Sequence, residues 1–263
     1  MIFSELKKQI SQEIEAVSDK FSIYIETEEG SIAINETKRR RAASLIKVPI
    51  LMEGYRQVEN REIHPDTLVY IDKKMSVSGS GVISYLTNGH IGSIQNMLEL
   101  MIIVSDNTAT NVLLDKLDID KVNALTHSIG CTDTLIERML MDKDAQSAGL
   151  DNYTSAKDMV LLLKRINENN DFFSRQSQLQ MLDILGNQQF THKLPLYGEE
   201  KDGIKFYHKT GELEGVEHDA AIMEAKGRTL YAAVLCEDMY PNAEGQRLIS
   251  NMGQLLIAYI KNK

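Results

Sequence analysis

The chain has 263 residues, of which 43% are hydrophobic and 25% are charged, as expected for an ordinary globular protein with a sizeable core. Its 29 basic and 38 acidic side chains give a net charge of −9. This balance argues against general nucleic-acid binding, because neutralising phosphates requires clustered Lys and Arg. No apolar run approaches the roughly 20 residues that a membrane-spanning helix needs.

The N-terminal residues have no long apolar core and no small-residue cleavage site, so the chain as written carries no signal peptide. We therefore expect a cytoplasmic protein, or an exported one whose N-terminus was trimmed. Cys131 and Cys236 lack a C-x-x-C or metal-ligand spacing, which favours two buried free thiols over a disulfide. The histidines show no paired ligand spacing either, so we predict no metal and no cofactor.

Hydrophobic periodicity divides the chain into strand-bearing ends and a helical middle. Apolar residues at helical spacing over 2–17 predict a first helix, and alternation on both sides of Glu29 and Gly30 predicts a β-hairpin. Residues 42–185 are mostly of helical pattern, and an amphipathic helix ends the chain. The strands are predicted at 21–26, 31–35, 204–209, 219–224 and 229–236.

This order predicts an α+β fold in three layers, with one antiparallel sheet of about five strands flanked by the terminal helices. An all-helical subdomain would be inserted between the two halves of the sheet. The expected boundaries are a discontinuous α/β subdomain over 1–36 plus 186–263 and an all-helical subdomain over 37–185. Together they would form one catalytic domain.

Three short motifs occur in order along the chain: S-x-x-K at Ser44, S-D-N at Ser105 and K-T-G at Lys209. By average composition, S-x-x-K occurs by chance about once in a chain of this length, and S-D-N or K-T-G about once in twenty such chains. The ordered set is expected on the order of once in a thousand chains or less. The ordered set is therefore strong evidence that the three motifs belong to one functional site, whereas S-x-x-K alone is not.

Ser44 is the candidate nucleophile because a base stands three residues away, on the same face of a helix. A helix that begins near Ser44 would accommodate Pro49 and place unpaired backbone N–H groups beside the hydroxyl. Lys47 could act as that base if burial and a neighbouring cation such as Lys209 lower its pKa. For Ser44 alone, the alternative is a helix N-cap.

The S-D-N motif is a polar patch between two apolar helical runs, which is costly unless the patch is bonded or functional. We expect Ser105 to point into the site as a proton shuttle and Asn107 to hold Lys47 and a substrate amide. Asp106 is expected to bond the backbone and set the turn. The alternative is that the motif merely caps the following helix.

The K-T-G motif is expected at the end of a strand. Gly211 would let a substrate backbone approach closely, while Lys209 and Thr210 would bind an anionic group. Strand alternation places Thr210 on the face opposite Lys209, so twist must bring its hydroxyl into the site. The alternative for Lys209 is an exposed strand lysine.

With these motifs the chain resembles class A β-lactamases and their relatives among the penicillin-recognising serine hydrolases. The resemblance covers nearly the whole chain and implies a β-lactamase/transpeptidase-like fold. It implies that Ser44 is acylated, that Lys47 is its base and that Ser105 relays protons. It also implies that Lys209 and Thr210 bind the substrate carboxylate. The oxyanion hole would use the backbone N–H groups of Ser44 and Glu212.

Two features depart from the family pattern. Between Arg138 and Asn152 there is no Glu-x-x-Leu-Asn motif, whose Glu activates the deacylating water in class A enzymes. Glu212 stands where the family usually has a small or hydroxylated residue, and an inward carboxylate would repel an anionic substrate. We expect the Glu212 side chain to face outward into solvent. The carboxylates that could replace the missing Glu are Glu137, Asp142, Asp144 and Asp151.

The sequence thus predicts a monomeric serine hydrolase that forms a Ser44 acyl-enzyme with β-lactams or related amides and esters and deacylates slowly. One alternative is a D-alanyl-D-alanine peptidase or small esterase. Another is a non-catalytic penicillin-binding sensor. In each case the partner is a small molecule, with no nucleic acid and no membrane span.

Overall fold

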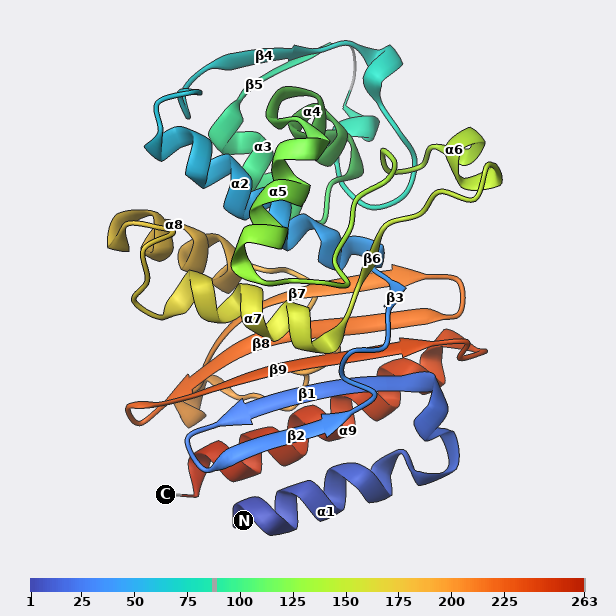
Figure 1. Ribbon diagram of the computed structural model, residues 1–263, viewed down its shortest axis with the longest axis vertical. Coiled ribbons are helices and arrows are strands. Elements are labelled where there is room, and N and C mark those ends of the chain that lie inside the picture. The colour runs from blue at the N-terminus through green and yellow to red at the C-terminus, as the bar shows by residue number, and fades with distance from the viewer. Residues whose placement is uncertain (87–88, 263) are drawn as a thin grey trace.

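A five-stranded antiparallel sheet, in the order β2-β1-β9-β8-β7, forms the middle layer of the computed structural model, which describes residues 1–86 and 89–262. Strand β1 pairs with β9, from Phe21 opposite Cys236 to Glu26 opposite Tyr231, so the two ends of the chain share one sheet. The predicted α+β fold is therefore confirmed (Figure 1). The strands are β1 (Phe21–Thr27), β2 (Gly30–Ile34), β7 (Lys205–Leu213), β8 (Val216–Ala225) and β9 (Arg228–Glu237).

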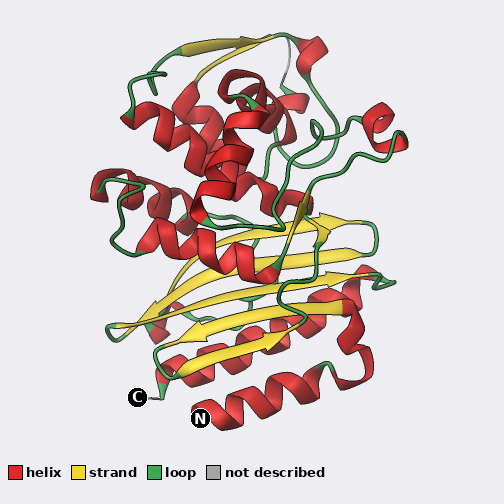
Figure 2. Ribbon diagram, in the orientation of Figure 1, coloured by secondary structure: helices red, strands yellow, loops and turns green. Residues whose placement is uncertain are grey.

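Helices cover both faces of this sheet (Figures 1 and 2). The terminal helices α1 (Phe3–Glu13) and α9 (Asn242–Lys261) lie on one side, and α7 (Ala156–Asn167) and α8 (Arg175–Gly186) lie on the other. Helix α1 turns Leu6 and Ile10 inward at a spacing of four residues, and both are fully buried. The sheet thus separates two apolar cores, one under the terminal helices and one shared with the helical part of the molecule.

Within its described residues, the segment expected to be all helical, 37–185, also contains four short strands that form two-stranded pairs. The prediction missed them because two paired residues show no periodicity, and a four-residue strand shows too little of it. The strands are β3 (Arg40–Arg41), β4 (Leu68–Ile71), β5 (His90–Ser93) and β6 (Tyr153–Thr154). The helices are α2 (Lys47–Glu59), α3 (Ile94–Ile103), α4 (Asn107–Leu117), α5 (Ile119–Ile129) and α6 (Lys143–Ser147). The 3₁₀ turns of the chain are η1 (Glu15–Lys20), η2 (Ala43–Ile46), η3 (Lys73–Met75), η4 (Ile83–Tyr85) and η5 (Glu200–Asp202).

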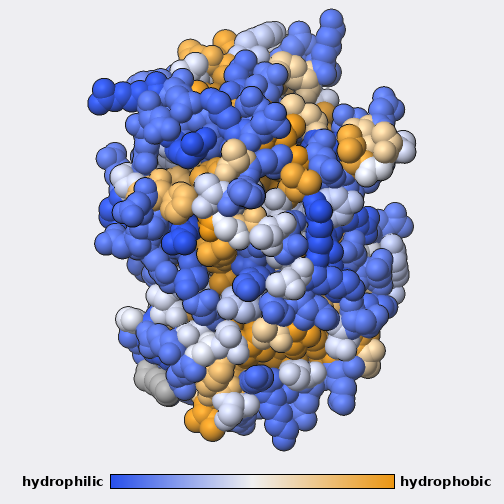
Figure 3. All heavy atoms as spheres, viewed as in Figure 1, coloured by the Kyte–Doolittle hydropathy of each residue, from blue (hydrophilic) through white to orange (hydrophobic). Residues whose placement is uncertain are grey.

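Polar side chains cover most of the face seen in Figure 3, with smaller apolar patches between them. Within the described residues, no helix combines the length and the apolar character needed to cross a bilayer. Cys131 and Cys236 are both buried and free, which confirms the expectation of two unpaired thiols.

Gly253 lets helix α9 approach the chain at Leu194. A Cβ atom on Gly253 would lie 2.2 Å from the Leu194 carbonyl oxygen and 2.8 Å from its Cα. Backbone atoms cannot rotate away, so the overpacking cost of about 1–3 kcal/mol should exceed the gain of about 1 kcal/mol in helix propensity. We expect Gly253→Ala to lower the free energy of unfolding by about 1–2 kcal/mol in urea denaturation.

The matched control is Gly245→Ala in the same helix, where the nearest atom to the new Cβ is the Glu217 side-chain Cβ at 3.3 Å. Gly245→Ala should lower the free energy of unfolding less than Gly253→Ala does. A Gly253→Ala protein as stable as the parent would contradict the packing argument.

Candidate active site

The three sequence motifs converge where the edge of the sheet meets the helical part of the molecule. The turn η2 carries Ser44, the segment between α3 and α4 carries Ser105, and the edge strand β7 carries Lys209. The half-buried Ser44 lines a cavity of about 220 Å³ together with Ser105 and Thr210. The structure therefore brings the predicted residues into one site.

Two element boundaries differ from the prediction. Ser44 lies in a 3₁₀ turn, and the α-helix begins three residues later at Lys47, with Pro49 in its first turn as expected. Strand β7 does not end at the K-T-G motif but continues to Leu213, because its pairing with β8 extends that far. The motif therefore lies inside an edge strand.

Gly211 sets how closely this edge strand approaches the nucleophile. A Cβ atom there would lie 3.2 Å from the Ser44 backbone nitrogen and 3.2 Å from the Ala43 Cβ. Any side chain would push β7 away from η2. The glycine thus serves the contact between two segments of this chain, in addition to the predicted space for a substrate.

The Lys47 side chain is fully buried and is held by the S-D-N segment. Its ammonium donates to the Ser105 carbonyl at 2.7 Å, to the Ser105 hydroxyl at 3.0 Å and to Asn107 Oδ1 at 2.9 Å. Burial holds the pKa of Lys47 well below its usual range, and the neighbouring charge of Lys209 lowers it further, against the opposing effect of Asp106. Lys47 is therefore suited to give up its proton, as expected from the sequence.

Lys209 approaches the same hydroxyl from the other side. Its ammonium donates to Ser105 Oγ at 3.0 Å and to the Thr210 carbonyl at 2.8 Å. Burial, followed by the charge of Lys193, lowers the pKa of Lys209 to about 7. Because Lys209 is fully buried, the alternative of an exposed strand lysine is wrong. The Ser105 hydroxyl thus connects two lysines, which is an arrangement through which a proton can pass.

Asp106 fixes the shape of this turn, as predicted. Its carboxylate accepts the backbone N–H of Ala109 at 2.9 Å, which caps α4, and those of Val82 and Ile83 at 2.7 and 2.9 Å. Ser105 itself has a left-handed backbone conformation with φ of 55°. The cap and the functional turn are therefore parts of one structure rather than alternatives.

A second cavity of about 320 Å³ adjoins Ser44 and is closed by residues 138–152. The ends of this segment are joined by an ion pair in which Arg138 Nη2 lies 2.7 Å from Asp151 Oδ1. The cavity is lined by Ala43, Ser44, Gly79, Ser80, Asn107, Arg138, Leu140, Met141, Lys143, Gln146, Asp151, Asn152, Glu212 and Leu213.

The four carboxylates proposed to replace the missing Glu have other roles or positions. Asp142 caps α6 by accepting the Ala145 N–H, and Asp144 is exposed to solvent. Glu137 accepts the Asp151 N–H at 3.2 Å. Asp151 does line the cavity, but its Oδ1 already accepts from Arg138 and from the Asn152 N–H.

Leu140 is a residue of this segment that lines the same cavity as Ser44 and Asn107. Asn111 holds its backbone by accepting the Leu140 N–H at 2.8 Å and donating to the Leu140 carbonyl at 2.9 Å. No local pattern singles out Leu140, because its position follows from the path of the loop. An apolar side chain therefore stands at a fixed point of the cavity wall.

Glu212 is exposed to solvent, as expected, but it does not stand apart from the site. It lines both cavities, where its Oε1 lies 2.9 Å from His192 Nε2 and 3.2 Å from Lys193 Nζ. The hydrogen bond from His192, followed by the charge of Lys193, lowers the pKa of Glu212 to about 2. Its charge is therefore partly compensated by neighbours far away in sequence.

Lys193 is a residue that the sequence analysis missed. Its side chain is fully buried, and its ammonium lies 2.6 Å from Glu217 Oε2 and donates to the carbonyl oxygens of Gly211 and His218 at 3.1 Å each. Nothing in the local pattern around Lys193 distinguishes it from an exposed loop lysine. The fold, rather than the sequence, brings it beneath the K-T-G strand.

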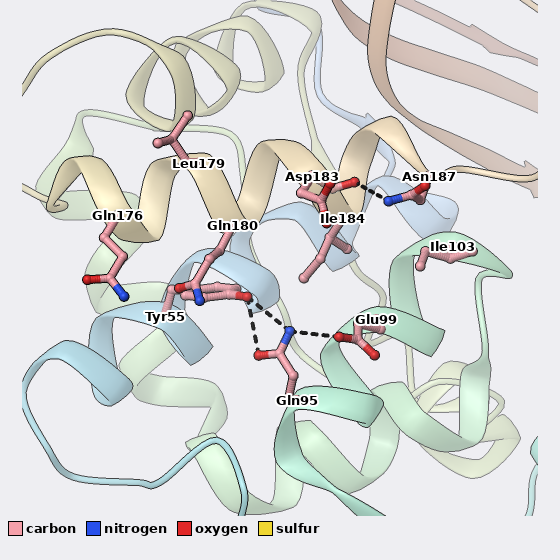
Figure 4. Close-up of a pocket in the computed structure, with 10 residues that line it drawn as sticks. All are labelled: Tyr55, Gln95, Glu99, Ile103, Gln176, Leu179, Gln180, Asp183, Ile184 and Asn187. Carbon is pink, nitrogen blue, oxygen red and sulfur yellow. Dashed lines mark hydrogen bonds between the residues drawn. The ribbon is translucent and has the colours of Figure 1, made fainter.

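A larger cavity of about 680 Å³ lies between α2, α3 and α8 (Figure 4). Tyr55, Gln95 and Glu99 form a hydrogen-bonded row along its wall, with Asp183 across from them. It contains none of the motif residues. The chemistry predicted from the motifs therefore belongs to the two smaller cavities beside Ser44.

Comparison with known proteins shows what the chain is similar to. The model of the beta-lactamase enzyme family matches residues 5–260. A beta-lactamase from Sphaerobacter thermophilus is 27% identical, with a TM-score of 0.88 over 98% of this chain and 97% of that one. PBP-A is 24% identical with a TM-score of 0.86, over 97% and 96% of the two chains. A class A beta-lactamase representative from Bacteroides cellulosilyticus is 18% identical with a TM-score of 0.82, over 98% and 99%. None of the curated proteins matches the sequence.

The burial of Lys209 should make the stability of the protein depend on pH. Its pKa is about 7 in the folded protein, against about 10.4 for an ordinary lysine. Between these values the unfolded state binds more protons, so the parent gains stability as the pH rises. Below both values the burial penalty is fully present. The change in the free energy of unfolding caused by Lys209→Met should therefore be more favourable at about pH 6 than at about pH 9. The difference between the two pH values should be on the order of 2 kcal/mol.

Urea denaturation at both pH values measures this difference. Lys8→Met, on the exposed side of α1, is the matched control for loss of a lysine. An equal effect of Lys209→Met at the two pH values would contradict the lowered pKa.

Proposed function

The chain belongs to the beta-lactamase enzyme family, and from that premise we propose that it is an active-site serine hydrolase that forms an acyl-enzyme on Ser44. Its substrates would be β-lactams or related amides and esters. The observation that carries the proposal is the placement of the Ser105 hydroxyl between the buried amines of Lys47 and Lys209, beside Ser44. In this arrangement Lys47 would be the base, Ser105 the proton relay and Lys209 the anion-binding group, next to the cavity that Ser44 lines.

Acylation follows from these roles. In its neutral form Lys47 takes the Ser44 hydroxyl proton while Ser44 Oγ bonds to the substrate carbonyl carbon. The backbone N–H groups of Ser44 and Glu212 donate to the oxyanion of the tetrahedral intermediate. Its collapse breaks the carbon–nitrogen bond, and the leaving nitrogen takes a proton from Ser105 Oγ, which regains one from Lys47. Lys209 and Thr210 bind the substrate carboxylate.

Deacylation is proposed to be the slow step. Water must attack the Ser44 ester from the cavity closed by residues 138–152, and a general base must take its proton. The cavity wall there presents Leu140, and the nearby carboxylate of Asp151 is engaged by Arg138. A long-lived acyl-enzyme favours, as a second candidate function, a D-alanyl-D-alanine peptidase that β-lactams inhibit.

The first test is the intact mass of the protein against time after mixing with a penicillin. We expect the mass to rise by one penicillin, to remain raised for many minutes and to stay unchanged in Ser44→Ala, because acylation has its residues and deacylation lacks a base. Rapid decay of the adduct would contradict slow deacylation. Labelling of Ser44→Ala, or no adduct with any β-lactam or ester, would contradict the proposed nucleophile.

A carboxylate introduced at Leu140 should supply the missing base. Leu140→Glu places an acid in the wall of the cavity that Ser44 also lines, so we expect the acyl-enzyme to decay on the order of a hundredfold faster, a typical contribution of general-base catalysis. The control is Leu140→Gln, which has nearly the same shape without a basic carboxylate. Equal lifetimes for Leu140→Glu, Leu140→Gln and the parent would mean that Leu140 does not face the deacylating water.

A further inference from the structure

We propose that Lys193 is a positioning residue for the oxyanion hole, acting through the peptide group that joins Gly211 to Glu212. Its buried ammonium binds the carbonyl oxygen of this peptide and so orients and polarises the N–H group at the other end. That N–H is the oxyanion donor assigned to Glu212, so the inference rests on the proposed function. Under this inference, stabilisation of the transition state also depends on Lys193, which lies outside the three sequence motifs.

The Gly211 carbonyl points toward β8. Lys193 Nζ lies 3.1 Å from the Gly211 oxygen and 3.1 Å from the His218 oxygen. Gly211 and His218 are opposite one another in the pairing of β7 with β8. One ammonium can reach both oxygens only if both carbonyls point into the space between these two strands.

The Glu212 N–H group points away from β8. In a trans peptide the N–H points opposite to the carbonyl of the same peptide group. Since the Gly211 carbonyl points toward β8, the Glu212 N–H points toward the other side of β7, which is the free edge of the sheet. On that side Ser44 and Glu212 line the same two cavities, and the Ser44 nitrogen lies against Gly211.

The Lys193 ammonium polarises the peptide group that carries the Glu212 N–H. A hydrogen bond to a carbonyl polarises its peptide group, and such coupling strengthens the next bond by roughly 10–30% in condensed-phase estimates. The effect is larger when the donor is charged, because charge-assisted bonds are about twice as strong as neutral ones. A flip of the peptide would also leave a buried cation without its acceptor, so the bond resists misorientation.

The fully buried Lys193 also contacts two carboxylates. Glu217 lies 2.6 Å away, and Glu212 lies 3.2 Å away on the side of the cavities. A purely structural ion pair with Glu217 would explain these contacts as well. The two roles differ in one observable, since only a positioning residue changes the bond order of the acyl carbonyl held in the oxyanion hole.

The test is isotope-edited infrared spectroscopy of the acyl-enzyme formed with a penicillin carrying ¹³C at the β-lactam carbonyl. The variant is Lys193→Met combined with Glu217→Gln, so that no buried carboxylate is left without its cation. The matched control is Glu217→Gln alone, which keeps Lys193 and retains an oxygen that can accept from Asn242 and Gln246.

In the double variant we expect the ester carbonyl stretch to move to higher wavenumber and acylation to slow on the order of tenfold, less than the 10²–10³-fold lost with a whole oxyanion donor. The control should keep the parent's stretch and rate. An unchanged stretch and rate in a folded, acylated double variant would overturn the inference and leave the proposed function intact. Absence of any Ser44 adduct in the parent would overturn both.

Thermal unfolding of each protein checks that the fold is retained. If the double variant does not fold, Lys193→Gln with Glu217→Gln provides a milder change, because the amide keeps a neutral donor near the Gly211 carbonyl. The expected stretch then lies between those of the parent and of the acyl-enzyme unfolded in denaturant. A stretch equal to the parent's would again assign Lys193 a structural role alone.

Discussion

The site depends on the burial of three lysine amines beside Ser44. Lys47, Lys193 and Lys209 are all fully buried around the edge strand β7 and the Ser105 turn. Burial lowers the pKa of Lys47 and of Lys209, the charge of Lys209 lowers the pKa of Lys47 further, and the charge of Lys193 lowers that of Lys209. This arrangement costs stability, and the fold maintains it with backbone carbonyls, the Ser105 hydroxyl and the carboxylate of Glu217. The reactivity proposed for Ser44 is therefore a consequence of how the two halves of the molecule close over these amines.

The close contact between β7 and η2 makes that burial possible. These segments come from opposite ends of the chain, and the sheet joins them because β1 pairs with β9. Gly211 removes the side chain that would hold the segments apart, and His218 donates from Nε2 to the Arg41 carbonyl just before Ser44. The Cys236 N–H donates to the other ring nitrogen, and burial lowers the pKa of His218 to about 4, so the ring stays neutral in this role. The geometry of the nucleophile thus rests on the sheet as well as on the helix that follows it.

Periodicity and motif spacing predicted the five strands, the terminal helices and the residues that meet around Ser105. These features depend on patterns of residues that are close together in the sequence. The surroundings of Glu212 could not be predicted, since His192 and Lys193 reach it from a loop twenty residues earlier with no periodic signal. Leu140 was missed for a related reason: what matters is the path of a loop held by the ion pair of Arg138 with Asp151. The prediction thus failed where charges and apolar groups obtain their roles from tertiary contacts, which is where functional sites most often depart from local rules.

The two sides of Ser44 are unequal, and this asymmetry bears on what the protein does. On the side of the sheet, buried amines and backbone donors favour attack on a carbonyl. On the side of residues 138–152, Leu140 stands at the cavity wall and the carboxylate of Asp151 is committed to an ion pair. An acyl group would therefore enter a site equipped for its formation more than for its hydrolysis by water. A substrate that brought its own nucleophile, such as an amine or alcohol, would not need the missing base in the same form. Under the proposed function, one short loop would thus set the preference between water and such an acceptor, while the rest of the fold would carry out acylation.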